Sequence, residues 1–322
     1  MRTYVLSRII QAFIMIIVAF VFSFFLFRIV PGDPTLAITG DPRLPLETKR
    51  MLYKMFGLDK PLHEQLLIFI INAFKGNLGI SYQYKIPVTQ LLLERLWNTL
   101  ILLLPATLLS ILIGIVMGML AGWFRGKTMD TILTSLATLF WSTPSFWAGM
   151  FMIYLFAVRF HIFPTGGMMS YEVSYTDWWS SMSDFLHHLF LPMVTYAVIY
   201  SGQYALVLRN SLSEVLSEDY ILLAEAKGCT EFQILRKHAL KNASLPLVTM
   251  VGVNLGRLLL GSITIETVFT WPGVGRLVYE AVYYHDYPVL QGIFVFFITV
   301  TILLTVIVDI LYTYLDPRVR LR

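Results

Sequence analysis

Long runs without charge constrain this chain more than any other feature of its sequence. The hydrocarbon core of a bilayer is roughly 30 Å thick, so a helix needs about 20 predominantly apolar residues to cross it. Six runs of about this length lie between the charged residues, the fifth interrupted only by Arg257: 9–27, 96–124, 131–158, 185–208, 242–265 and 287–308. A large soluble enzyme could bury one such run in a helix pair, but six in one chain predict an all-α, polytopic membrane protein with six transmembrane helices.

Composition supports the same fold class. Hydrophobic residues make up 57% of the chain and charged residues 14%, with a mean hydropathy of +0.70. An ordinary soluble domain is less apolar and more charged, so the excess apolar surface must face lipid. The first run exceeds the apolar region of a secretory signal peptide, about 7 to 15 residues, and no small-x-small cleavage site precedes Pro31. We therefore expect an uncleaved first helix.

The basic residues predict an orientation. If both termini are cytoplasmic, twelve Lys and Arg residues fall in inside segments, whereas the two short outer loops carry only Arg159 and Arg276. This excess is typical of cytoplasmic loops, and the outer segment 29–95 is long enough to be exempt from the rule. Because the basic residues lie beside predicted helices, the net charge of +4 reports topology and does not indicate a nucleic-acid partner.

The chain divides at about residue 95. Residues 1–95 are predicted to hold the first transmembrane helix, a helix-ending turn at 31–34, and an extracytoplasmic segment whose residues 46–75 form short amphipathic helices. Residues 96–322 are predicted to form a core of five transmembrane helices. A long cytoplasmic loop, residues 209–244, joins the fourth and fifth of the six predicted spans.

That loop is the strongest functional feature of the sequence. It is too long and too helix-prone for a simple connector. Within it, the small residues Ala224 and Ala226 would let another surface approach closely, and Gly228 permits a backbone break between two short helices. The loop is therefore predicted to form a protruding helix-turn-helix that binds a partner.

The same loop resembles that of a known family, the inner-membrane permease subunits of ATP-binding-cassette (ABC) importers in the oligopeptide, dipeptide and nickel branch. The loop residues that carry the resemblance are Tyr220, Ala224-Glu225-Ala226-Lys227-Gly228, His238-Ala239, Asn242 and Pro246. Further matches extend along the chain: Pro31-Gly32-Asp33-Pro34, Gly57-Leu58-Asp59 with Pro61, Gly76-Asn77-Leu78-Gly79, Trp271-Pro272-Gly273 with Gly275-Arg276, Tyr287-Pro288 with Gln291-Gly292, and Asp316-Pro317-Arg318. The chain departs from the branch at Glu225, which often is arginine there, and at Arg257, which usually is uncharged.

The resemblance implies a type I ABC importer permease fold in a prokaryotic inner membrane. It implies that the chain forms half of a translocation pathway with a second, homologous permease, and that two cytoplasmic ATP-binding subunits and an extracytoplasmic substrate-binding protein are its other partners, besides membrane lipid. It assigns contact with the ATPase to the following residues: Tyr220, Ala224, Glu225, Ala226, Lys227, Gly228 and His238. ATP and Mg would be bound by the ATPase subunits, so no cofactor is expected in this chain.

No catalytic or metal site is predicted. The nearest approach to a phosphate-binding loop, Gly126-Lys127-Thr128, lacks the glycine that the motif requires five residues earlier. No nucleophile and base converge in the sequence, and the adjacent His187 and His188 would point to different faces of a helix. The chain is expected to be a non-catalytic subunit.

Arg257 is the one charge within a predicted span. It lies about twelve residues into the fifth run, roughly 18 Å along a helix and near the bilayer centre, where a charge costs about 2.5 to 3.5 kcal/mol. With Asn254 on the same helical face, it could line the translocation pathway; equally, it could pair with a carboxylate of the partner permease.

For the substrate, a short peptide is the leading hypothesis, followed by an oligosaccharide and then nickel. A different class, an ion-coupled secondary transporter, would need carboxylates within the membrane, but Glu266 and Asp309 lie at the ends of their runs. A membrane-embedded enzyme lacks a convergent catalytic set.

Overall fold

A computed structural model describes residues 2–29, 45, 47–48, 50–51, 59–170, 177–258 and 261–315, with side chains omitted at 2–5, 28–29, 255–257 and 307–315. This part of the chain is helical, and its β-structure is a single isolated bridge between Ile80 and Pro87. It forms two compact units, residues 1–95 with 277–322, and residues 96–276. The all-α fold class is confirmed.

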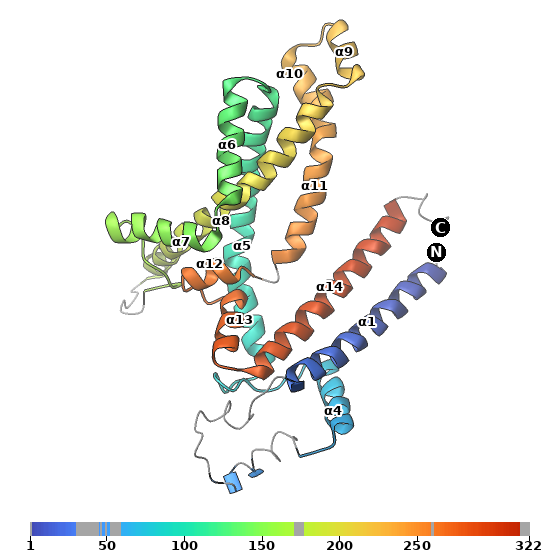
Figure 1. The fold of residues 1–322 in the computed structure, drawn as a ribbon, viewed down its shortest axis with the longest axis vertical. Helices are drawn as coiled ribbons and strands as arrows, with labels where there is room; N and C mark the ends of the chain where they lie inside the picture. Colours follow the sequence, from blue (N-terminus) through green and yellow to red (C-terminus); the bar gives the residue numbers. More distant parts are fainter. Residues whose placement is uncertain are drawn as a thin grey trace. The chain divides into compact units, whose positions relative to one another are not determined.

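The first unit is built on two long helices. Helix α1 (Arg2–Ile29) packs along α14 (Tyr287–Leu315), and the shorter α4 (Leu62–Phe74) packs on α1 (Figure 1). Phe20 of α1 contacts α4 through two rings, since its ring centre lies 6.2 Å from that of Phe69 and 5.4 Å from that of Phe74. Apolar side chains of all three helices therefore form one small core.

In the second unit, the long helix α8 (Trp178–Val215) packs against α6, α7 and α11. Its other elements are α5 (Val88–Trp123) from residue 96 onward, α6 (Thr128–Ser142), α7 (Ser145–Met152), the π-helix η1 (Ile153–Arg159), α9 (Asp219–Ala226), α10 (Glu231–Gln233), the π-helix η2 (Ile234–Ala239), α11 (Leu240–Arg257) and α12 (Ile263–Val268). Helix α13 (Val274–Tyr283) begins at the end of this unit.

Glycines let α5 approach α8 closely. Gly114, Gly118 and Gly122 recur every four residues on α5, and a side chain at any of them would meet α8. At Gly118, a Cβ atom would lie 2.5 Å from the carbonyl oxygen of Ala205. Small residues at this spacing are typical of closely packed membrane helices.

We expect Gly118→Ala to destabilise the protein by about 1 to 3 kcal/mol, because the added methyl group can be accommodated only if backbone moves. Thermal unfolding of the purified protein in detergent measures the effect. Gly252→Ala is the matched control, since Gly252 also lies in a helix but has no atom within 4 Å of the added Cβ. Equal melting temperatures for the two variants would contradict the close-packing role.

Four helices are long and apolar enough to cross a bilayer, α1 over Leu6–Phe27, α5, α8 and α14 over Tyr287–Val306, within the described part of the chain. They confirm a polytopic membrane protein. The predicted third span, 131–158, is divided at Thr143-Pro144 between α6 and α7, and α6 alone rises only about 22 Å. The predicted fifth span corresponds to α11, which ends at Arg257. The count of six spans is therefore not confirmed.

The predicted extracytoplasmic segment is described only in part. Helix α4 matches one of its short amphipathic helices. The turn predicted at 31–34 and the motif residues Gly57 and Leu58 lie outside the described residues. The division into segments 1–95 and 96–322 stays a prediction.

Candidate functional site

Residues 217–239, between α8 and α11, form a compact helical projection that we call the knob. It contains α9, α10 and η2 and lies at one end of the second unit, where α8 ends and α11 begins (Figure 1). Four of its side chains are buried against α8 and α11: Ile221, Ala224, Ile234 and Ala239. The helix-turn-helix predicted from the sequence is present, and its apolar side is fixed to the ends of two long helices.

Gly228 forms the break between the two helical parts of the knob. Its φ of +78° lies in the left-handed region, which favours glycine at the residue after a helix end. The turn is closed by two backbone hydrogen bonds, from Gly228 N to Glu225 O at 2.9 Å and from Cys229 N to Ala224 O at 3.2 Å. No atom lies within 4 Å of the place a Cβ would take, so the backbone conformation, rather than a lack of space, favours glycine.

The second half of the knob starts with a reciprocal cap. The Thr230 backbone N–H donates to the Gln233 side chain at 3.0 Å, and the Gln233 N–H donates to the Thr230 hydroxyl at 3.4 Å. This arrangement satisfies donors that the first turn of a helix otherwise leaves unpaired. The second half is thus ordered locally as well as by its apolar core.

Three polar residues of the family motif meet where the knob joins α11. The Asn242 amide donates to the Tyr220 hydroxyl at 2.8 Å and to the His238 carbonyl at 3.3 Å. The first bond joins α9 to α11 across the loop. Tyr220 and His238, both predicted to contact the ATPase, therefore also help to hold the knob together.

The remaining predicted contact residues differ in exposure. Glu225, Ala226, Lys227 and Gly228 are exposed on the knob. Ala224, by contrast, is only 5% exposed. Its small side chain lets α9 pack closely in the apolar core that it shares with η2, α8 and α11.

Apolar side chains also lie on the outer surface of the knob. Leu222 is 62% exposed, Leu223 56% and Phe232 67%. None of these three residues was among the site residues predicted from the sequence, although apolar residues within a charged loop were an available signal. Their exposure gives the knob apolar surface that is suited to a protein partner.

Of the two predicted pathway residues, Asn254 and Arg257, the structure describes the side chain of Asn254. The Asn254 amide donates to the Tyr204 hydroxyl at 3.0 Å, which joins α11 to α8. Tyr204 is buried at the end of a row that includes the stacked rings of Tyr196 and Tyr200, 4.2 Å apart. The side chain of Arg257 lies outside the described residues, so the pairing of Asn254 with Arg257 stays a prediction.

Glu266 is a buried residue that sequence reasoning placed merely at the end of a span. It is fully buried in α12. Its carboxylate accepts hydrogen bonds from the Thr99 hydroxyl at 3.1 Å, the Ser262 N–H at 3.2 Å and the Arg276 N–H at 3.1 Å. The carboxylate therefore ties α5 to both ends of the segment 262–276.

The Trp271-Pro272-Gly273 motif belongs to the same segment. Trp271 is fully buried, and its indole N–H donates to the Asn98 carbonyl at 2.8 Å. The Asn98 amide in turn donates to the Pro272 carbonyl at 2.9 Å. The turn-rich motif is thus fixed to α5 by hydrogen bonds in both directions.

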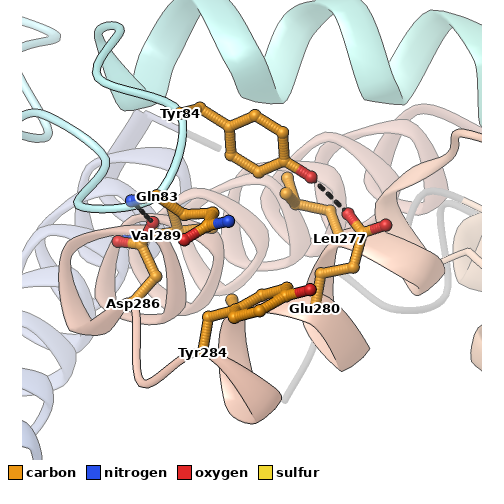
Figure 2. Close-up of a pocket in the computed structure, with 8 residues that line it drawn as sticks. Gln83, Tyr84, Leu277, Glu280, Tyr284, Asp286 and Val289 are labelled. Atoms are coloured by element: carbon orange, nitrogen blue, oxygen red, sulfur yellow. Dashed lines mark hydrogen bonds between the residues drawn. The ribbon is translucent and has the colours of Figure 1, made fainter. Parts of the chain in front are cut away.

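In the first unit, Asp286 anchors the loop that precedes α5. It accepts from the Ser81 hydroxyl at 2.5 Å and from the N–H groups of Tyr82 and Gln83 at 3.1 and 3.0 Å. Figure 2 shows the pocket beside it, where the Tyr84 hydroxyl points to Glu280. The lining side chains leave almost no room for even a water-sized molecule, which favours a structural role.

Comparison with known proteins covers nearly the whole chain. The family described as "Binding-protein-dependent transport system inner membrane component" matches residues 110–321, and its N-terminal counterpart, "Binding-prot-dependent transport system membrane comp, N-term", matches residues 1–103.

Individual relatives agree with these matches. The chain is 36% identical to the probable peptide ABC transporter permease protein y4tP of Sinorhizobium fredii, over 99% of this chain and 100% of the relative. It is 37% identical to the putative peptide transport system permease protein BAB2_1050 of Brucella abortus, over 99% of each. It is 36% identical to the dipeptide transport system permease protein DppB of Escherichia coli, over 92% of this chain and 93% of the relative.

The family resemblance inferred from the knob is therefore confirmed along the length of the chain. The apolar helices α1, α5, α8 and α14 are those of a multi-pass membrane component, and the identity to three permeases exceeds one residue in three. The chain belongs to the binding-protein-dependent transport system inner membrane component family and is a non-catalytic permease subunit of an ABC importer.

Proposed function

We propose that this permease forms half of a pathway that imports short peptides, and that its knob docks on a cytoplasmic ATPase subunit. The exposed apolar surface of the knob carries the docking proposal, because Leu222, Leu223 and Phe232 stand out from an otherwise polar loop. The peptide substrate is supported by the names of the three relatives.

The knob is built to transmit force. Ile221, Ala224 and Ile234 share one apolar core with Leu208 and Leu212 of α8 and with Ala243 and Leu247 of α11. Since packed interiors deform little, a push on the knob would move the ends of α8 and α11 with it. ATP-driven closure of the ATPase subunits would in this way rock the transmembrane helices between inward- and outward-facing states.

The other partners complete the proposal. A second, homologous permease supplies the other half of the pathway, two ATPase subunits bind ATP and Mg, and an extracytoplasmic protein delivers the peptide. Both termini and the knob lie in the cytoplasm, as the distribution of basic residues indicates. Asn254 and Arg257 remain the pathway residues that we propose.

We extend the proposed contact surface to residues whose side chains are exposed. Glu225, Ala226, Lys227 and Gly228 form it together with Leu222, Leu223 and Phe232, and Tyr220 and His238 support it from the α11 side. Ala224 is buried and does not belong to this surface. Its small side chain packs in the apolar core that α9 shares with η2, α8 and α11.

We expect Leu223→Ser and Phe232→Ser to weaken binding of the ATPase subunit, because burying an exposed Leu or Phe at an interface contributes about 1.5 to 3 kcal/mol. Co-purification of the ATPase subunit and peptide uptake in proteoliposomes measure the effect. Leu67→Ser is the matched control, since Leu67 is 58% exposed but lies on α4. Unchanged ATPase binding in both knob variants would remove the docking assignment.

Uptake assays on the reconstituted transporter test the substrate. Addition of di- and oligopeptides, oligosaccharides and Ni²⁺ to the complete transporter with its binding protein should show ATP-dependent accumulation of peptide. Accumulation of only sugar or Ni²⁺ would overturn the peptide assignment and leave the docking proposal standing. Uptake that persisted without ATPase subunits would instead favour the secondary-transporter class.

A further inference from the structure

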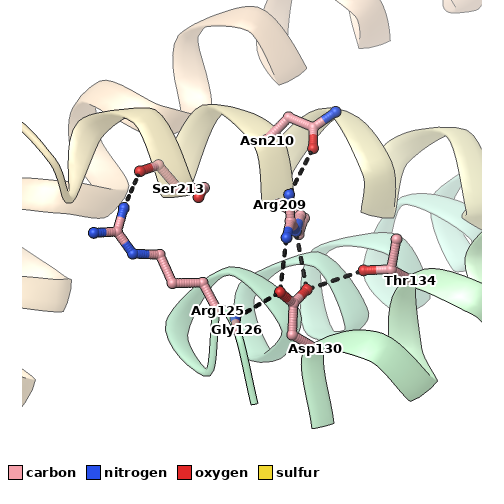
Figure 3. Close-up of polar contacts among 7 residues, drawn as sticks. All are labelled: Arg125, Gly126, Asp130, Thr134, Arg209, Asn210 and Ser213. Carbon is pink, nitrogen blue, oxygen red and sulfur yellow. Dashed lines mark hydrogen bonds and ion pairs between the residues drawn. The ribbon is translucent and has the colours of Figure 1, made fainter. Parts of the chain in front are cut away.

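An ion pair with a buried carboxylate joins α6 to α8 eight residues before the knob begins. Asp130, in the first turn of α6, is only 5% exposed, and Arg209 of α8 reaches it with two nitrogens, Nη2 to Oδ2 at 2.7 Å and Nε to Oδ1 at 2.9 Å (Figure 3). The Gly126 N–H and the Thr134 hydroxyl also donate to this carboxylate, at 2.9 and 3.0 Å. Both carboxylate oxygens are thereby saturated. Paired donation from one guanidinium fixes direction as well as distance.

The surroundings of Asp130 favour its charged form. The hydrogen bonds from Arg209 hold the pKa of this carboxyl well below its usual range, against the opposing effect of burial, and the Gly126 N–H and the Thr134 hydroxyl act in the same direction as Arg209. Asp130 directly precedes the third uncharged run, residues 131–158, so its carboxyl lies outside that predicted span. The ion pair is therefore a constant link between α6 and α8 and not a proton switch.

A second arginine holds the same region from the α5 side. Arg125, in the turn between α5 and α6, donates from Nη1 to the Ser213 carbonyl at 2.6 Å and to the Ser217 hydroxyl at 2.5 Å. Ser217 is the first residue of the knob, and its hydroxyl also donates to the Ser213 carbonyl at 3.0 Å. Arg125 thus binds the end of α8 and the start of the knob together.

These two links differ in kind from the neighbouring helix packing. Elsewhere in this unit, close contacts between α5 and α8 include glycines and apolar side chains, which form no directional bond. By contrast, the hydrogen bonds to the Asp130 carboxylate and to the Ser213 carbonyl are directional. They therefore fix the position of α8 along α6 and along the α5–α6 turn. They do so within the last two turns of α8, so the knob cannot move relative to the α5–α6 turn without breaking them.

We propose that Asp130, Arg209 and Arg125 form a clamp that positions the knob on the α5–α6 hairpin, so that movement of the knob is passed to α6 instead of being absorbed by bending of α8. The inference rests on the proposed docking of the knob on an ATPase. The three residues are positioning residues, since none of them lies on the exposed apolar surface of the knob.

The test uses the complete transporter in proteoliposomes and measures ATPase binding, ATP hydrolysis and peptide uptake together. For Asp130→Asn and Arg125→Gln, we expect the ATPase subunit to bind normally and the ATP hydrolysed per peptide imported to rise about tenfold, less for exposed Arg125 than for buried Asp130. Arg209→Lys keeps the charge but loses the paired donation, and an intermediate ratio is expected. Arg159→Gln, an exposed basic residue on η1, is the control and should leave the ratio unchanged.

The outcomes separate the two proposals. Loss of ATPase binding in Leu223→Ser, with an altered ratio in the clamp variants, supports both. An unchanged ratio in Arg125→Gln would overturn the clamp even if Asp130→Asn fails to fold, because exposed Arg125 can be replaced without leaving a buried charge unpaired. A fall in uptake that merely parallels a fall in assembled complex would also overturn it. If Leu223→Ser and Phe232→Ser bind the ATPase as strongly as the parent protein does, the docking proposal is wrong.

Discussion

Gly228→Trp is expected to lower peptide uptake and substrate-stimulated ATP hydrolysis by about tenfold or more, because a large ring would stand in the centre of the surface proposed to meet the ATPase. The permease itself should still fold. The left-handed backbone at Gly228 costs any other residue about 1 to 2 kcal/mol, and no neighbouring atom lies within 4 Å of an added Cβ. Uptake and ATPase stimulation in proteoliposomes, with co-purification of the ATPase, measure the effect.

Two further variants separate contact from strain. Gly228→Ala introduces the backbone cost with little bulk, so it should retain most uptake. Gly76→Trp is matched to Gly228→Trp in conformation, with a φ of +76° and equally open surroundings, but lies in the predicted extracytoplasmic segment. Full transport and full ATPase stimulation in Gly228→Trp would show that Gly228 lies outside the contact surface.

Glu266→Leu is expected to prevent accumulation of folded permease. Removal of the carboxylate leaves the Thr99 hydroxyl and the N–H groups of Ser262 and Arg276 without their acceptor in a fully buried site. Each buried donor without a partner costs about 1 to 3 kcal/mol, so the total approaches the whole stability of a typical domain. Glu266→Gln keeps the shape and one acceptor and should be milder.

Fluorescence-detected size-exclusion chromatography and thermal unfolding in detergent measure this difference. Glu94→Gln removes a negative charge from an exposed position on α5 and serves as the control, with a melting temperature equal to that of the parent. If Glu266→Leu melted at the same temperature as the control, the hydrogen bonds of Glu266 would contribute no net stability, and another contact would have to fix the segment 262–276.

The parts of the fold that depend on local sequence could be predicted. The uncharged run 96–124 indicates α5, and the run 287–308 indicates α14, because length and apolarity alone decide whether a helix can cross a bilayer. Gly228 indicates the break in the knob, because its conformation is a property of the residue itself. The spacing of charges could not show that the third run bends, although Thr143-Pro144 carried a local signal.

The parts that depend on distant contacts could not be predicted. Asp130 and Arg209 are 79 residues apart, and Thr99 and Glu266 are 167 apart, so no local pattern brings either pair together. Burial of Ala224 depends in the same way on α8 and α11, which turn one side of α9 inward and leave Leu222 and Leu223 outside. A motif can name the residues of a site without showing which of them face the partner.

The shared core beneath the knob has a consequence for inhibition. Helix α9 has only 8 residues, well below the roughly 12 to 15 at which an isolated helix becomes even marginal in water. Its apolar side packs on η2 of the same loop and shares its core with residues of α8 and α11, which a free peptide would lack. A free peptide copied from residues 217–239 would therefore be mostly unfolded and a weak competitor for the ATPase. A useful mimic must carry its own scaffold, for example a cross-link that replaces the two supporting helices.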